Sequence, residues 1–195
     1  MTDEPLDDEP PSDSQKARML RGDLYEAGDP ELRADHERCR VLVEAFNATS
    51  VTEVAARHSL LHTLFGAVGE GVEVRPPFQC DYGFNISCGA RTFVNYGAVF
   101  LDVAPISIGS DVQIGTSVQL LTATHPFDAE TRRQGWESGS PITIGDGVWL
   151  GGGVIVCPGV TIGENAVVGA GSVVAADLPP SVLAVGNPAR IVRPL

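Results

Sequence analysis

The sequence has little positive charge and no long hydrophobic run. Thirteen lysine and arginine residues stand against 25 aspartate and glutamate residues, so the formal net charge is −12. A chain this acidic is a poor partner for nucleic acid and for anionic membrane surfaces. Its apolar stretches are too short to span a bilayer, and its acidic start lacks the basic and apolar regions of a signal peptide. We therefore expect a cytoplasmic protein that binds neither nucleic acid nor a membrane.

Cysteine is also scarce, and its spacing argues against two further classes of protein. The four cysteines, Cys39, Cys80, Cys88 and Cys157, lie far apart and form no CxxC pair. A zinc site built on cysteine uses closely spaced pairs, and a disulfide framework is typical of short secreted chains. The spacing therefore favours four reduced cysteines and no metal cofactor.

The first 65 residues divide into an acidic tail and a helical region. Residues 1–13 hold three prolines and almost no apolar side chains, so they cannot bury enough surface and are predicted to be disordered. Residues 14–65 show the helical spacing of apolar side chains. Asp29 followed by Pro30 is a typical helix start. Ser50, with Glu53 three residues later, fits the capping box of another helix.

Residues 66–195 repeat with a period of six. IGSDVQ from Ile108, IGDGVW from Ile144 and IGENAV from Ile162 each open with an aliphatic residue and carry a small or aliphatic residue four positions later. This period fits short strands joined by tight turns, with one side chain of each unit pointing inward. Three units close one triangular coil, and the coils stack into a mainly β fold, a parallel β-helix. Aspartate and asparagine at the corners, where unusual backbone angles are needed, are expected at Asp111, Asp146 and Asn165.

The repeat is interrupted directly after a histidine. The loop 126–141, PFDAETRRQGWESGSP, follows His125, which is the only histidine among the repeats. A stack of coils is smooth, so an extruded loop can form one wall of a pocket. Histidine titrates near neutral pH and can act as a general base without special tuning. The other histidines, His36, His58 and His62, belong to the helical region and are expected to be ordinary surface residues.

Four segments carry a resemblance to a known family. CDYGFNI from Cys80, NYGAVFLDVAPISIG from Asn95, TATHPFDAETR from Thr122 and VGNPARIV from Val185 resemble the hexapeptide-repeat sugar O-acetyltransferases, the group of the maltose and thiogalactoside O-acetyltransferases. The likeness runs from about residue 17 to residue 195. It implies a left-handed parallel β-helix with an N-terminal helical region that contributes to the acceptor site. It also implies a homotrimer with active sites between subunits, which moves an acetyl group from acetyl-CoA to a hydroxyl of a sugar such as maltose or glucose.

The resemblance also implies roles for particular residues. His125 matches the catalytic general base of the family, and Asn95 matches the residue that holds the attacking hydroxyl beside it. Asp81, Asp102 and Glu137 match polar positions that bind the acceptor. All five are hydrogen-bonding side chains suited to sugar hydroxyl groups.

The coenzyme positions implied by the resemblance follow in the later coils. They are Trp149, Gly152, Ala170, Ala175 and Arg190. Gly152 lies in a run of three glycines, which would let the pantetheine arm approach the backbone closely and would offer an N–H to the developing oxyanion. One departure stands out, because many relatives carry Thr-Lys where this chain has Ala175 and Ala176. The missing lysine removes a phosphate contact and leaves Arg190 and Arg193 to provide such contacts.

Three other functions are considered beside sugar acetylation. The same transfer could use a different acceptor, such as an antibiotic, a serine hydroxyl or a nucleotide sugar. The β-helix could instead serve as a binding module without catalysis. A zinc carbonic anhydrase on this scaffold takes its ligands from three histidines, and the repeats contain only His125.

Overall fold

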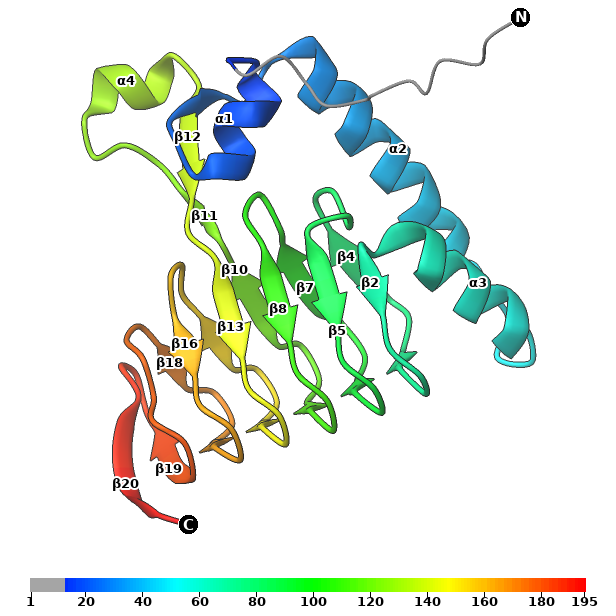
Figure 1. The fold of residues 1–195 in the computed structure, drawn as a ribbon, viewed down its shortest axis with the longest axis vertical. Coiled ribbons are helices and arrows are strands. Elements are labelled where there is room, and N and C mark those ends of the chain that lie inside the picture. Colours follow the sequence, from blue (N-terminus) through cyan, green and yellow to red (C-terminus); the bar gives the residue numbers. More distant parts are fainter. Residues whose placement is uncertain (1–12) are drawn as a thin grey trace, which may run out of the picture.

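The computed structural model describes residues 13–195 (Figure 1). The expected disordered tail, residues 1–13, lies outside the described residues except for Asp13. Helices α2 (Pro30–Asn47) and α3 (Val54–Leu64) cover the N-terminal end of a β-helix, at the coil that contains β2 (Ala67–Val68) and β4 (Phe78–Cys80). Within residues 13–195 no helix combines the length and the apolar character needed to cross a membrane.

Three of the helices precede the β-helix. Helix α1 (Gln15–Arg21) is capped by Ser14, and α2 (Pro30–Asn47) begins as predicted, with Asp29 at the N-cap and proline in the first turn. The predicted start at Ser50 is wrong, because α3 (Val54–Leu64) begins later with Glu53 at the cap position and no side-chain cap bond. The Glu53 carboxylate turns back and accepts the N–H of Ser50 at 2.7 Å, so it stabilises the turn before the helix.

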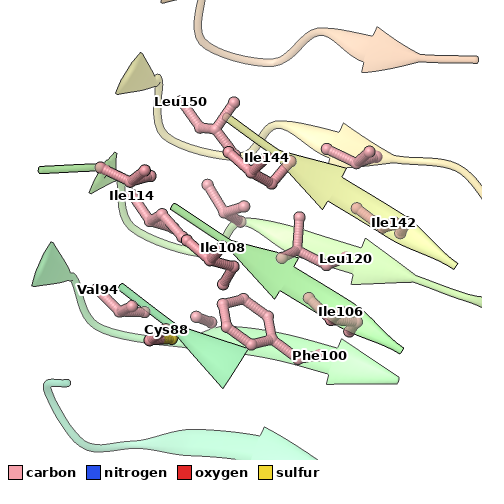
Figure 2. Packing of buried hydrophobic residues seen from close by; sticks show 14 of the residues in the cluster. Cys88, Val94, Phe100, Ile106, Ile108, Ile114, Leu120, Ile142, Ile144 and Leu150 are labelled. Carbon is pink, nitrogen blue, oxygen red and sulfur yellow. The ribbon is translucent and has the colours of Figure 1, made fainter. Parts of the chain in front are cut away.

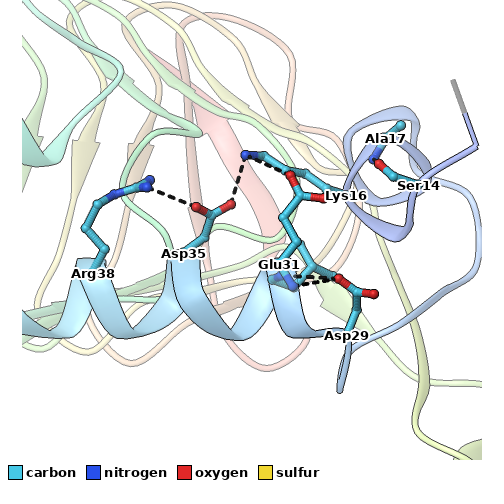
Figure 3. Close-up of polar contacts among 8 residues, drawn as sticks. Ser14, Lys16, Ala17, Asp29, Glu31, Asp35 and Arg38 are labelled. Carbon is cyan, nitrogen blue, oxygen red and sulfur yellow. Dashed lines mark hydrogen bonds and ion pairs between the residues drawn. The ribbon is translucent and has the colours of Figure 1, made fainter. Parts of the chain in front are cut away.

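An ion-pair network fastens α1 to α2 (Figure 3). The Lys16 ammonium lies 2.9 Å from an Asp35 carboxylate oxygen and 3.6 Å from Glu31, and Arg38 binds the other Asp35 oxygen at 3.0 Å. Asp35 is only 6% exposed, and a buried carboxylate is tolerated when cations pair with it. The short helix α1 is thereby held beside α2.

Three sheets form the three sides of the β-helix, and the chain visits them in turn (Figure 1). The first sheet contains β2 (Ala67–Val68), β5 (Ile86–Cys88), β8 (Ile106–Ile108), β13 (Ile142–Ile144) and β16 (Thr161–Ile162). The second contains β3 (Glu73–Val74), β6 (Phe93–Val94), β9 (Gln113–Ile114), β14 (Trp149–Leu150), β17 (Val167–Val168), β19 (Val182–Val185) and β20 (Arg190–Pro194). The third contains β4 (Phe78–Cys80), β7 (Ala98–Leu101), β10 (Gln119–Leu121), β15 (Ile155–Val156) and β18 (Val173–Val174). All neighbours are parallel except β19 and β20.

The aliphatic residues of the repeat form a continuous interior (Figure 2). Ile106 pairs with Ile142 and Ile108 with Ile144, and all four side chains point into the coil. Phe100 fills the centre and is fully buried. Burial of one such side chain contributes about 1.5–3 kcal/mol to the stability of the fold. The positions that repeat every six residues are therefore the inward positions of the core.

The corners follow the predicted backbone chemistry with one exception. Asp111 and Asn165 adopt φ values of 59° and 57°, as expected. Asp146 does not, because the next residue, Gly147, takes the positive angle with φ 67°. Asp146 instead accepts the N–H of Ser110 from the neighbouring coil at 2.7 Å through Oδ1. Its carboxylate therefore joins two coils.

The extruded loop folds back onto the N-terminal region and forms a fourth, small sheet. This sheet contains β1 (Tyr25–Glu26), β12 (Trp136–Gly139) and β11 (Ala123–Thr124), in that order. Both pairings are antiparallel, with Tyr25 opposite Glu137 and Thr124 opposite Ser138. Helix α4 (Ala129–Arg133) forms the outer part of the loop. The small sheet holds both ends of the loop in place, with His125 immediately after β11.

Candidate active site

The residues singled out from the sequence lie along two edges of the third sheet. We call the edge between the third and first sheets the His125 edge. The edge between the second and third sheets is the Asn95 edge. The residues of the His125 edge are Asp81, Asp102, His125, Glu137 and Ala175, and those of the Asn95 edge are Asn95, Gly152, Ala170 and Arg190, with Trp149 beside them.

His125 is presented to solvent beside a carboxylate. Its side chain is 60% exposed, and Nε2 lies 3.9 Å from Oε1 of Glu137, whose side chain is 15% exposed. The antiparallel pairing of β11 with β12 sets this relationship, because Thr124 lies opposite Ser138. A bond between the two hydroxyl groups of that pair, at 2.8 Å, reinforces the register. The imidazole is therefore accessible and has an anionic neighbour.

Glu137 is held from the other side by a tyrosine that the sequence did not single out for this contact. The Tyr25 hydroxyl donates to Oε2 of Glu137 at 2.9 Å. Tyr25 is fully buried, and burial, followed by the nearby Glu137 carboxylate, raises the pKa of its hydroxyl. Tyr25 therefore remains a hydrogen-bond donor throughout the working pH range.

Asp102 lies beneath the site and does not reach its surface. Its side chain is fully buried, and Oδ1 accepts the backbone N–H of Asp81 at 3.0 Å and of Tyr82 at 2.9 Å. Burial raises the pKa of the Asp102 carboxyl, although these backbone bonds oppose the rise. Asp102 therefore fixes the backbone that carries Asp81, and the expectation that it binds the acceptor stays a prediction.

A hollow of about 210 Å³ opens next to these carboxylates. Asp81, Tyr82 and Glu137 line it together with Arg33 and His36 of α2. His36 Nε2 lies 3.9 Å from Asp81 Oδ1, so His36 is part of the hollow and is not the ordinary surface residue expected from the sequence. Burial, and then the charges of Asp102 and Glu137, raise the pKa of Asp81 to about 7. The hollow therefore offers polar groups of both donor and acceptor kind.

The Asn95 edge carries small residues in its later coils, among them Gly151, Gly152 and Ala170. Gly171 donates its N–H to the Gly152 carbonyl at 2.9 Å, which places Ala170 one coil beyond Gly152. A Cβ added to Gly151 would lie 2.5 Å from the Ala170 nitrogen, so this corner accepts no side chain there. Trp149 is 55% exposed on the adjacent outer face. An exposed backbone edge flanked by an aromatic ring suits an extended, flexible ligand.

Asn95 and His125 do not meet within one chain. Asn95 precedes β7 and Asp102 follows it, so the two edges are separated by the strand Ala98–Leu101. Four residues of strand span roughly 13 Å. Ala175 is likewise separated from Gly152, because it follows β18 at the His125 edge. The residues singled out from the sequence therefore form two groups on opposite edges of the same sheet.

Metal ligands and disulfides are absent from the site as far as the structure describes it. Over residues 13–195 no three histidine, cysteine or acidic side chains gather in a way that could hold a metal ion. All four cysteines are free, including Cys39 and Cys80, whose sulfur atoms lie 3.5 Å apart.

Two sequence patterns and several proteins of known structure or description are similar to this chain. Residues 18–69 match the "Maltose acetyltransferase hexapeptide capping motif", and residues 141–176 match "Bacterial transferase hexapeptide (six repeats)". Nodulation protein L of Rhizobium meliloti is 48% identical over 178 residues, covering 91% of this chain and 97% of that protein.

Two solved structures share the fold over nearly the whole chain. A maltose O-acetyltransferase from Clostridium difficile is 47% identical, with a TM-score of 0.92 over 95% of this chain and 99% of that one. A hexapeptide-repeat acetyltransferase from Vibrio cholerae, complexed with acetyl coenzyme A, is 41% identical, with a TM-score of 0.87 over 93% and 98%. The β-helix is therefore of the left-handed, hexapeptide-repeat kind, as the resemblance implied.

Proposed function

This chain belongs to the hexapeptide-repeat acetyltransferases related to maltose O-acetyltransferase, and on that premise we propose that it transfers an acetyl group from acetyl-CoA to a sugar hydroxyl, as on maltose or glucose. The observation that carries the proposal is the hollow beside His125. Its carboxylates, Asp81 and Glu137, can bind neighbouring hydroxyl groups, and the exposed imidazole of His125 lies 3.9 Å from the Glu137 carboxylate. Sugars are recognised by such arrays of hydrogen-bonding partners.

The proposed mechanism is a direct transfer with both substrates bound. His125 takes the proton from the acceptor hydroxyl as its oxygen attacks the thioester carbonyl. The carbon–sulfur bond then breaks, and the proton leaves with the thiol of coenzyme A. The N–H of Gly152 stabilises the negative charge that develops on the carbonyl oxygen. Asn95 holds the attacking hydroxyl, and Glu137 stabilises the protonated imidazole.

Acceptor binding is proposed to involve Asp81 and Glu137, which line the hollow directly. Asp102 would act through Asp81, because it holds the Asp81 backbone from below. His36 and Arg33 add donors on the α2 side of the hollow. This division lets the N-terminal helices contribute to acceptor choice while the β-helix carries the catalytic histidine.

The active enzyme is proposed to be a homotrimer in which the His125 edge of one subunit meets the Asn95 edge of the next. This arrangement joins two half-sites that lie roughly 13 Å apart within one chain. The outer face of the third sheet supports it, because most of its outward positions are apolar (Val99, Leu101, Leu121, Ile155 and Val173), with Gln79 and Gln119 as the polar ones. The outward positions of the first sheet are small and mostly polar: Ala67, Ser87, Ser107, Thr143 and Thr161. An apolar sheet face of this kind marks an interface.

The coenzyme is proposed to run along the Asn95 edge of one subunit, past Trp149, Gly152 and Ala170, toward Arg190. Ala175 would approach it from the neighbouring subunit, since it belongs to the His125 edge. Arg190 is exposed at the end of this path and can bind phosphate. The four free cysteines support a reducing compartment such as the cytoplasm.

Thiol release tests the proposed function. The purified protein should release free coenzyme A from acetyl-CoA when maltose or glucose is added, and His125→Ala should lose at least about 100-fold in kcat. His58→Ala, an exposed histidine on α3, serves as the matched control and should keep wild-type turnover. Near wild-type activity in His125→Ala would remove this residue from the mechanism.

The acceptor is tested in the same assay. Turnover with an antibiotic, serine or a nucleotide sugar but with no simple sugar would replace the proposed acceptor class. Failure to bind coenzyme A by calorimetry would favour a binding module without catalysis.

A further inference from the structure

We propose that Tyr25 is a positioning residue that fixes Glu137 beside His125, so that the N-terminal segment is part of the catalytic machinery. The inference rests on the proposed role of His125 as the base. It concerns a residue that touches neither the reacting atoms nor the hollow, and it acts through the Glu137 carboxylate.

The two residues are brought together by strand pairing. Tyr25 of β1 lies opposite Glu137 of β12 in antiparallel register. Its hydroxyl donates to Oε2 at 2.9 Å, across a separation of 112 residues in the sequence. The other carboxylate oxygen, Oε1, is the one that lies 3.9 Å from Nε2 of His125. The two oxygens of Glu137 therefore face different partners, and the bond from the tyrosine fixes the orientation of the carboxylate relative to the imidazole.

The surroundings of Tyr25 make this contact specific. The ring is fully buried in a cluster with Met19, Leu32, Tyr82 and Val103. A buried hydroxyl group needs a hydrogen-bond partner, and Glu137 is the partner that the structure gives it. The hydroxyl and the carboxylate thus satisfy one another at a point where the ring cannot move without disturbing the cluster.

The spacing between Glu137 and His125 has a chemical consequence. A gap of 3.9 Å is too long for a direct hydrogen bond, but it is close enough for the carboxylate to stabilise a positive charge on the imidazole. That charge appears when His125 accepts the proton of the acceptor hydroxyl. Rotation of the Glu137 side chain would change this spacing, and the Tyr25 hydroxyl prevents the rotation. Tyr25 is therefore expected to influence kcat more than the binding of acetyl-CoA.

The first experiment removes only the hydroxyl. Tyr25→Phe keeps the ring that fills the cluster, so the variant should fold. Its kcat for sugar-dependent thiol release should fall on the order of ten-fold, with the KM for acetyl-CoA within two-fold of wild type. In the Glu137→Gln background the same change should alter kcat by less than about two-fold, because the carboxylate it positions is gone. Additive losses in the double variant would overturn the proposal.

The second experiment separates positioning from loss of stability. Met19 is fully buried in the same cluster, and Met19→Ala loosens it without removing a bond to Glu137; Met19→Leu replaces this control if the alanine variant does not fold. The control should lower the melting temperature while kcat stays within two-fold of wild type. An equal fall of kcat in the control and in Tyr25→Phe would show a purely structural role. Failure of the proposed function itself would appear separately, as full activity in His125→Ala.

Discussion

Asp102 holds the backbone of Asp81 from below, with its fully buried Oδ1 accepting the Asp81 N–H at 3.0 Å. The same oxygen accepts the N–H of Tyr82, so one hidden carboxylate organises two residues that line the hollow. Among the acidic residues of the His125 edge, Asp102 is therefore a buried support, whereas Asp81 and Glu137 line the hollow.

Removal of the Asp102 side chain should destabilise the fold. Asp102→Ala leaves the N–H groups of Asp81 and Tyr82 without their acceptor, which costs roughly 2–4 kcal/mol of unfolding free energy. Asp102→Asn retains an acceptor oxygen and should lie within about 1 kcal/mol of wild type. Urea unfolding followed by circular dichroism measures both. Equal stability of the alanine variant and wild type would contradict the supporting role.

Asp81 should make stability depend on pH. Its pKa in the folded protein is raised to about 7, first by burial and then by the charges of Asp102 and Glu137. Because the folded pKa is above the unfolded value, the contribution of Asp81 to stability is fully present below about pH 4 and is lost as the pH rises to 7. The loss should amount to a few kcal/mol at most. Asp81→Asn cannot titrate, so the difference in unfolding free energy between variant and wild type should grow across that range. A difference independent of pH would refute the assignment.

The apolar outer face of the third sheet should control assembly. Ile155→Arg places a charge on that face and should shift the proposed trimer toward monomer, lowering the association constant at least about 100-fold. Thr143→Arg puts the same side chain on the outer face of the first sheet and should leave the trimer intact. Analytical ultracentrifugation distinguishes the species. The same sedimentation for both variants would argue against this interface.

Trp149 should contribute to coenzyme binding. Its side chain is 55% exposed next to the Asn95 edge, and its loss in Trp149→Ala should raise the KM for acetyl-CoA about ten-fold, with kcat little changed. Gln113→Ala alters the residue that pairs with Trp149 one coil earlier and should leave this KM unaltered. A rise in the KM for the sugar alone would instead assign Trp149 to the acceptor.

The β-helix could be predicted from the sequence because its core residues recur every six positions along the chain. An inward aliphatic residue recurs at every unit, so Ile108, Ile144 and Ile162 identify the coil without knowledge of distant contacts. The N-cap at Asp29 was equally accessible, since capping depends on neighbouring residues. The interruption after His125 was visible as a break in that period.

The small sheet and its tyrosine could not be found this way. The pairing of Tyr25 with Glu137 joins two short strands 112 residues apart, and neither strand has a period of its own. His36 reads as a surface residue of a helix, and only the packing of α2 against the hollow reveals its place beside Asp81. The positive φ expected at Asp146 is found at Gly147 instead, because glycine adopts a positive φ at a lower energetic cost.

The pairing of β1 with β12 also affects the order in which the protein can be completed during synthesis. A nascent chain that has left the ribosome only as far as Leu121 can stack its first coils, yet it holds Tyr25 without a partner strand. Closure of so long a segment is slow and entropically unfavourable until the later residues arrive. The pairing that places Glu137 beside His125 can thus form only after the first coils have been made, and a chain truncated before β12 would carry folded coils with an unfinished catalytic pocket.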